Sequence, residues 1–135
     1  MSAQPPLPSS PYLLETAYTP PLLRVTVTGG EDTTLPVTGE YWLRIADLVG
    51  RSGARQLLVV DHMQGEVMND EELDRFFDLI EGRGLADVRI AYVEGRVDQT
   101  SRIEYAELLA RERGYLVRMF GNETDALVWL RHGGT

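Results

Sequence analysis

The sequence predicts a single α/β domain: an N-terminal hairpin, then alternating strands and helices forming a mixed, mostly parallel sheet with about four helices. Three observations support this fold class. Two strand-like segments open the chain, and from residue 37 onward segments with helical spacing of apolar residues alternate with short apolar runs. Repeated strand–helix–strand units are typical of parallel sheets with right-handed crossovers. A length of 135 residues with 43% hydrophobic content suits one domain with a substantial core.

The two ends of the chain are expected to lie outside this domain. Residues 1–11 contain four of the seven prolines and little that could pack, which predicts a flexible tail. Residues 133–135 are expected to form a second, short tail. The domain should therefore span residues 12–132.

The first two strands should pair as a hairpin at the edge of the sheet. They are expected at residues 12–18 and 22–29, and polar and apolar side chains alternate in the second. Pro20 and Pro21 separate the two segments and mark the turn between them.

Four later segments have the apolar spacing of amphipathic helices. The first is expected at about residues 39–49 and the second from near Asn69. Ser101 and Glu104 have the spacing of a capping box at the start of the third, and Asn122 is expected to cap the fourth. The strands between the helices are expected at residues 55–61, 88–95 and 115–120. Glycines should end the first three helices, namely Gly50, Gly53, Gly82, Gly84 and Gly114. The expected apolar faces are Trp42, Ile45, Ala46 and Val49; Leu73, Phe76, Phe77 and Ile80; Ile103, Ala106 and Ala110; and Ala126, Leu127, Trp129 and Leu130.

The composition excludes several kinds of chemistry. The net charge is −8 and the chain has no lysine, so a Walker-type phosphate loop, a Schiff-base mechanism and a phosphoryl receiver are not expected. The acidic balance also argues against nucleic-acid binding. No cysteine is present, which excludes disulfides and thiolate sites. Apolar runs are far shorter than a membrane span and no signal segment is evident, so we expect a cytoplasmic protein.

The order and lengths of these segments resemble the STAS domain, the fold of the anti-sigma-factor antagonists, and more closely its SpoIIAA-like branch. The resemblance covers about residues 12–132 and includes "LLVVD", "VRIAYVEG" and the closing "FGNETDALVWL". It implies a regulatory domain that binds a protein partner.

The stretch "VVDHMQGEVMNDEEL" at residues 59–73 contains the position at which such antagonists are regulated. They resemble the pattern D-x-x-G-x-x-x-M-D-S-S-G, whose second serine is phosphorylated by the anti-sigma kinase. A gap-free overlay places the first aspartate on Asp61, the methionine on Met68, the second aspartate on Asn69 and the two serines on Asp70 and Glu71. Neither acidic side chain has the hydroxyl group that a serine kinase phosphorylates. The acidic residues either imitate the phosphorylated state or serve only as the first turn of a helix capped by Asn69.

Two functional hypotheses follow. The first is a non-catalytic interaction module that docks a protein partner on Asn69, Asp70 and Glu71. The second is a small apolar-ligand or lipid-binding protein with a cavity of a few hundred Å³ beneath the second helix, gated by residues 62–68 with Gly65 as a hinge. The residues expected to line that cavity are Met63, Val67, Met68, Phe76 and Phe77.

Other kinds of site are not expected. Asp61, His62 and Glu66 could be read as metal ligands, but one histidine with loop carboxylates makes a weak set, so no metal or other cofactor is predicted. Thr100 and Ser101 are explained as helix-capping residues, and no nucleophile motif is present, so the chain is not expected to be an enzyme. The acidic charge predicts no stable association with anionic membranes. A homodimer is left open.

Overall fold

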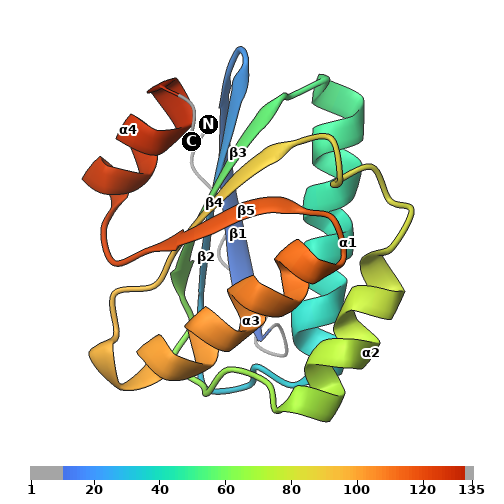
Figure 1. The fold of residues 1–135 in the computed structure, drawn as a ribbon, viewed down its shortest axis with the longest axis vertical. Helices are drawn as coiled ribbons and strands as arrows, with labels where there is room; N and C mark the ends of the chain where they lie inside the picture. The colour runs from blue at the N-terminus through green and yellow to red at the C-terminus, as the bar shows by residue number, and fades with distance from the viewer. Residues whose placement is uncertain (1–10, 133–135) are drawn as a thin grey trace.

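The computed structural model describes residues 11–132, so the predicted tails lie outside the described residues, apart from Pro11. A five-stranded sheet has the order β1-β2-β3-β4-β5 (Figure 1). The strands are β1 (Tyr12–Thr19), β2 (Leu22–Gly29), β3 (Gln56–His62), β4 (Arg89–Val93) and β5 (Leu116–Phe120). β1 and β2 are antiparallel, and β2 through β5 are parallel neighbours. The predicted edge hairpin and mostly parallel sheet are confirmed.

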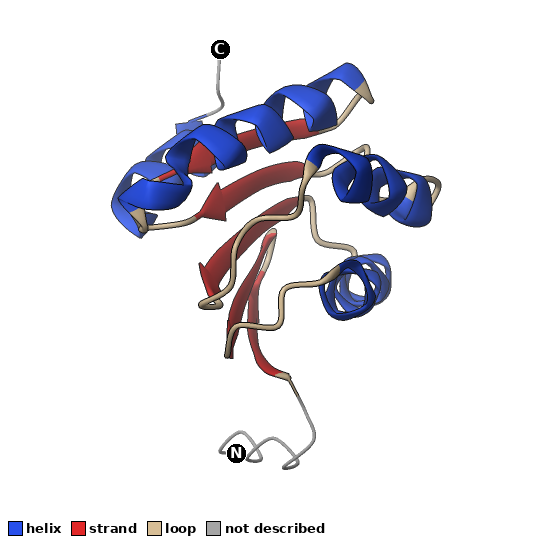
Figure 2. Ribbon diagram, turned by 90° about the horizontal axis from the view of Figure 1, so that it is seen from below, coloured by secondary structure: helices blue, strands red, loops and turns tan. Residues whose placement is uncertain are grey.

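Four α-helices connect and follow these strands. They are α1 (Leu35–Ser52), α2 (Asp70–Ile80), α3 (Thr100–Glu112), which follows a 3₁₀ turn at Val97–Gln99, and α4 (Glu123–His132). Figure 1 shows α4 set apart from the other three helices, and Figure 2 shows the strands as one twisted layer beside α1 and α2. No helix within residues 11–132 combines the length and apolar character needed to cross a bilayer.

Alternation along the strands produces two cores, one on each face of the sheet, because successive side chains point to opposite faces. In β3, Leu57 and Val59 belong to the larger core beneath α1, α2 and α3, whereas Leu58 and Val60 belong to a smaller core. The smaller core is closed by Ala126 and Leu130 of α4. The buried faces expected for α1, α2 and α3 are confirmed, and in α4 Ala126 and Leu130 are buried while Leu127 and Trp129 are partly buried.

Two helix boundaries differ from the sequence prediction. α1 begins at Leu35 rather than near residue 39, since Pro36 suits the first helical turn. It continues through Gly50 to Ser52 and is capped by Gly53, whose φ of 75° suits glycine. The predicted capping box at Ser101 is wrong: α3 already begins at Thr100, and no side chain caps it. The 3₁₀ turn before α3 leads the backbone directly into the helix, which removes the need for a side-chain cap.

Candidate functional site

The start of α2 stands at the end of a loop, residues 63–69, that leaves the carboxyl end of β3. Asn69 caps the helix as predicted: its side chain accepts a 2.9 Å hydrogen bond from the Glu72 backbone N–H. Glu72 accepts a 3.2 Å bond from the Asn69 N–H in return, which completes a capping box that the sequence analysis did not identify. Asp70 and Glu71 are exposed in the first turn, and Glu71 pairs with Arg75 at 2.8 Å.

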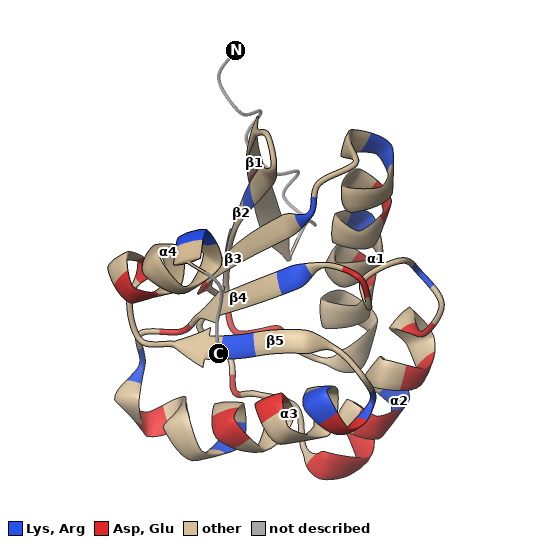
Figure 3. Ribbon diagram, turned by 45° about the horizontal axis from the view of Figure 1, so that its top comes forward, with Lys and Arg blue, Asp and Glu red and all other residues tan. Residues whose placement is uncertain are grey.

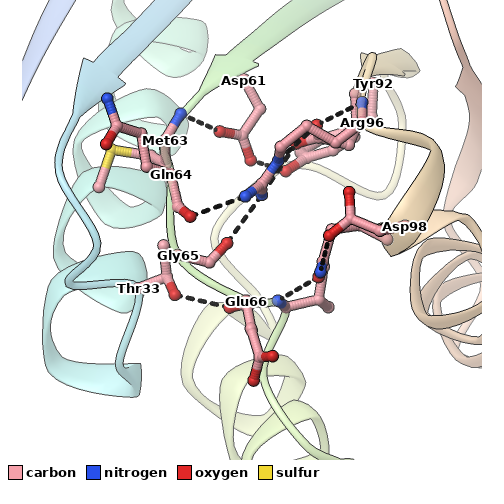
Figure 4. A network of polar contacts seen from close by, with 12 residues as sticks. Thr33, Asp61, Met63, Gln64, Gly65, Glu66, Tyr92, Arg96 and Asp98 are labelled. Atoms are coloured by element: carbon pink, nitrogen blue, oxygen red, sulfur yellow. Dashed lines mark hydrogen bonds and ion pairs between the residues drawn. The ribbon is translucent and has the colours of Figure 1, made fainter.

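The loop before α2 is held from one side by residues that follow β4. Arg96 donates two hydrogen bonds to loop carbonyl oxygens, 2.8 Å to Gln64 and 2.7 Å to Gly65 (Figure 4). The buried Gln99 side chain accepts a 2.9 Å bond from the Val67 N–H. Backbone atoms of three loop residues are therefore fixed by side chains about thirty residues away in sequence.

The opposite side of the loop is held by the segment between β2 and α1. The Thr33 hydroxyl donates a 2.6 Å bond to the Glu66 carbonyl, and the Gln64 N–H donates to the Gly30 carbonyl at 2.9 Å. A side chain at Gly65 would clash with the backbone oxygen of Glu31 and with Thr33. Close packing therefore explains this glycine without the hinge that the sequence suggested.

An ion pair with the buried Glu94 side chain holds Arg96, the arginine that bonds the loop carbonyls. The Glu94 side chain is only 3% exposed, and its carboxylate accepts a 3.0 Å bond from Arg96 Nε. The same carboxylate accepts the Arg96 backbone N–H at 2.9 Å. The hydrogen bond that Arg96 donates to Glu94 is also the main reason that the pKa of Arg96 is raised, and this guanidinium is charged while it holds the loop.

Asp61 lies behind this loop and is half-buried. One carboxylate oxygen accepts the Met63 N–H at 2.7 Å and the other accepts the Tyr92 hydroxyl (Figure 4). Burial raises the pKa of Asp61, although the hydrogen bonds from Tyr92 and Met63 oppose this shift. Burial and the neighbouring Asp61 charge together raise the pKa of Tyr92. The tyrosine therefore remains a hydrogen-bond donor at neutral pH.

The raised pKa of Asp61 predicts how its replacement depends on pH. The folded state binds the Asp61 proton more tightly than the unfolded chain does. This contribution to stability is fully present below the unfolded pKa, about 3.9, and is lost as the pH rises through the folded pKa. Asparagine keeps an oxygen for the Met63 N–H without this cost. We expect the free energy of unfolding of Asp61→Asn to rise relative to wild type between about pH 3 and pH 7.

Urea denaturation of wild type and Asp61→Asn at about pH 3 and at about pH 7 measures this difference in the free energy of unfolding. Asp87→Asn, the same change at an exposed position, is the matched control. An Asp61→Asn protein that loses stability relative to wild type as the pH rises would mean that Tyr92 and Arg96 outweigh the effect of burial.

A cavity of about 110 Å³ lies beneath α2. Its aromatic wall is a chain of neighbouring rings: Trp42 lies 6.0 Å from Phe76, Phe76 lies 5.2 Å from Phe77, and Phe77 lies 6.0 Å from Tyr115, between ring centroids. Asp61 and Arg96 line the cavity alongside these apolar residues.

Four of the five residues expected to line a ligand cavity do so, namely Val67, Met68, Phe76 and Phe77. The fifth, Met63, is buried elsewhere, close beside Gly29. Sequence reasoning missed Trp42, Tyr92 and Arg96, which reach the site from other elements. Because the cavity holds about 110 Å³, it is smaller than the few hundred Å³ that a lipid-sized ligand requires.

The residues considered as metal ligands are not brought together. The Asp61 carboxylate bonds Tyr92, while His62 and Glu66 are exposed. His62 lines an open groove of about 460 Å³ at the carboxyl ends of β3 and β4, together with Glu94, Asn122 and Glu123. Within residues 11–132, no three His, Asp or Glu side chains are grouped so that they could hold a metal ion.

The fold of this chain is similar to that of a solved structure. An anti-sigma factor antagonist from Mycobacterium paratuberculosis has a TM-score of 0.59 to this chain, at 17% sequence identity, over 91% of this chain and 97% of that one. No family model matches the chain. No curated protein matches it either. The STAS-like fold that the sequence resemblance implied is thus confirmed.

Proposed function

We propose that the chain is a non-catalytic interaction module that docks a protein partner at the first turn of α2, without control by phosphorylation. The partner class suggested by the structural neighbour is an anti-sigma factor, since that neighbour is an antagonist of such a factor. The contact residues proposed are Asn69, Asp70 and Glu71.

The observation that carries this proposal is the fixed position of the acidic turn. Asp70 and Glu71 are exposed, while the loop that precedes them is bonded by Thr33, Arg96 and Gln99. A surface already held in place loses less conformational entropy on binding than a mobile one. The acidic turn is therefore suited to recognition by a basic surface of a partner.

The absence of a hydroxyl side chain that a serine kinase could phosphorylate supports constitutive binding. Residues 61–76 contain no serine, threonine or tyrosine, and the two serine positions of the antagonist pattern hold Asp70 and Glu71. Negative charge is therefore present at this turn without a kinase.

Calorimetric titration with an anti-sigma factor from the same organism tests the proposal. Asp70→Arg should weaken binding by about tenfold, equivalent to about 1.4 kcal/mol, because it reverses a charge at the docking turn. The matched control is Asp87→Arg, an equal charge reversal at an exposed position in the connection between α2 and β4. If the two variants bind the anti-sigma factor with equal affinity, the partner does not dock at the first turn of α2.

The same mixture supplied with ATP tests the absence of phosphorylation. Mass spectrometry should find no phosphate on residues 61–76 while binding persists. A phosphopeptide from this stretch would show that the chemistry assigned to it is wrong.

A second candidate function is the binding of a small apolar molecule, and the cavity beneath α2 is the observation that favours it. An engineered apolar cavity of about 150 Å³ is known to bind benzene, so about 110 Å³ suits only a ligand of that size or smaller unless α2 moves. Native mass spectrometry of protein purified from its own host would reveal a retained ligand and the subunit count together.

A further inference from the structure

Three arginines line one open pocket at the β5 edge of the sheet. Arg89 lies at the start of β4, Arg111 in the last turn of α3 and Arg118 in β5. They line a pocket of about 550 Å³ together with Glu107, Leu116 and Trp129. Figure 3 shows basic segments on the neighbouring strands β4 and β5 and at the end of α3, whereas acidic segments run along α2 and α3. The sheet register explains the convergence, because Arg89 pairs with Leu116 and Arg118 stands two residues further along β5.

The charges in this pocket are not balanced. Glu107 is the only carboxylate among the residues that line it, and it pairs with Arg111 at 3.2 Å. Arg111 also donates to the Val117 carbonyl at 3.2 Å, so its position is fixed. Within residues 11–132, Arg89 and Arg118 have no ion pair with a carboxylate. Three guanidinium groups therefore face one carboxylate, in a chain whose net charge is −8.

Arg89 has an unusual environment for a charged side chain. Its Nη1 is the one buried side-chain nitrogen or oxygen atom in the described part of the chain that has no hydrogen-bond partner. The guanidinium lies over the Trp129 ring, 5.2 Å from the ring centroid. Stacking of this kind orients a guanidinium and leaves the N–H donors at its edge available. A buried charged donor without an acceptor is costly, and an anion in the pocket would supply the acceptor.

We propose that this pocket binds a phosphate group. A tetrahedral dianion matches the charge of two unpaired guanidinium groups, and its oxygens suit the planar fork of donors that arginine presents. Arg89 and Arg118 bind the anion directly, Arg111 closes the side next to α3, and Trp129 holds Arg89 in place. The phosphate belongs to a soluble phosphate compound or to a lipid headgroup, two sources that share this chemistry.

Titration of the full chain with inorganic phosphate, followed by the NMR signal of the Trp129 indole N–H, tests the proposal. The chain has two tryptophans, so the signal is easily assigned. The indole shift should saturate. Arg118→Gln should weaken binding about tenfold, the loss expected for one charge-assisted hydrogen bond. Arg118 is exposed, so this change should leave the fold intact. Arg83→Gln, at an exposed arginine between α2 and β4, is the matched control and should bind as wild type does.

The source of the phosphate is resolved by vesicles of phosphatidylcholine with and without phosphatidic acid. Sedimentation that requires both phosphatidic acid and Arg118 would assign the pocket to a headgroup and overturn the expectation of no stable membrane association. Phosphate binding without sedimentation would assign it to soluble phosphate compounds. An indole signal that does not move, or that moves equally in wild type and Arg118→Gln, would overturn the proposal. Arg89→Met keeps an aliphatic side chain against Trp129 and removes the other arginine proposed to bind the anion. It therefore tests the phosphate site independently of Arg118→Gln.

Discussion

Replacing Phe76 with alanine should lower the free energy of unfolding by about 3–5 kcal/mol. Phe76 is 7% exposed and sits between Trp42 and Phe77 in the row of rings beside the cavity. The truncation removes these contacts and adds the volume of a phenyl ring to a space of about 110 Å³ that already exists. Since the surrounding helices relax only partly, a cavity cost adds to the lost burial. Urea denaturation measures the change.

The control for this prediction is Leu108→Ala on α3, since Leu108 is 53% exposed. That variant should stay within about 0.5 kcal/mol of wild type. Benzene, added to both wild type and Phe76→Ala, separates a packed core from a ligand site. If the enlarged cavity is dry and apolar, benzene should restore part of the lost stability and raise the melting temperature of Phe76→Ala more than that of wild type. A loss below about 1 kcal/mol would mean that α2 is not packed as the structure has it.

Replacing Arg96 with alanine should cost about 2–3 kcal/mol. The change leaves the Glu94 carboxylate, which is 3% exposed, without its charged partner, and it frees the carbonyls of Gln64 and Gly65. Breaking a fully buried pair costs about 3–5 kcal/mol, and the lower figure applies because the Arg96 side chain is 31% exposed. The double variant Arg96→Ala/Glu94→Gln should recover part of the loss, since the unpaired charge is gone.

Two measurements distinguish loss of the contacts between Arg96 and the loop from general destabilisation of the fold. Hydrogen exchange at the Val67 N–H, which bonds the Gln99 side chain, should accelerate more than exchange in β3. Arg75→Ala, which removes an exposed pair with Glu71 on α2, should change stability by less than about 1 kcal/mol. Unchanged protection at Val67 in Arg96→Ala would show that the loop is held without the arginine.

Local patterns were enough to predict the fold. The apolar stripe of α2 and the alternation in β2 depend on the periods of a helix and a strand, which neighbouring residues express directly. Asn69 and Asn122 were identified as caps because a cap acts on backbone groups only two or three residues away. The error at Ser101 has the same origin: the spacing of a capping box is present, but the preceding 3₁₀ turn lies outside the pattern.

The contacts that build the sites could not be predicted in this way. Arg96 and Gln99 act on a loop about thirty residues earlier, and no local pattern links Gly65 to Thr33. From the sequence alone, the gate of the ligand-binding hypothesis was therefore placed in this loop. Likewise, Arg89 and Arg118 line one pocket only because β4 and β5 are parallel neighbours in a particular register. Each of these contacts forms only when the whole domain has folded.

The placement of α4 has a consequence for biosynthesis. Among the described helices it is the one that covers the smaller core, and it follows all five described strands. On the ribosome, Leu58 and Val93 therefore emerge long before Ala126 and Leu130 can shield them. A chain that is released after β5 displays an apolar patch on the face of the sheet that α4 would cover, the kind of surface that chaperones and proteases recognise. Cellular abundance should thus respond more sharply to truncation within the last helix than to substitutions on the acidic turn.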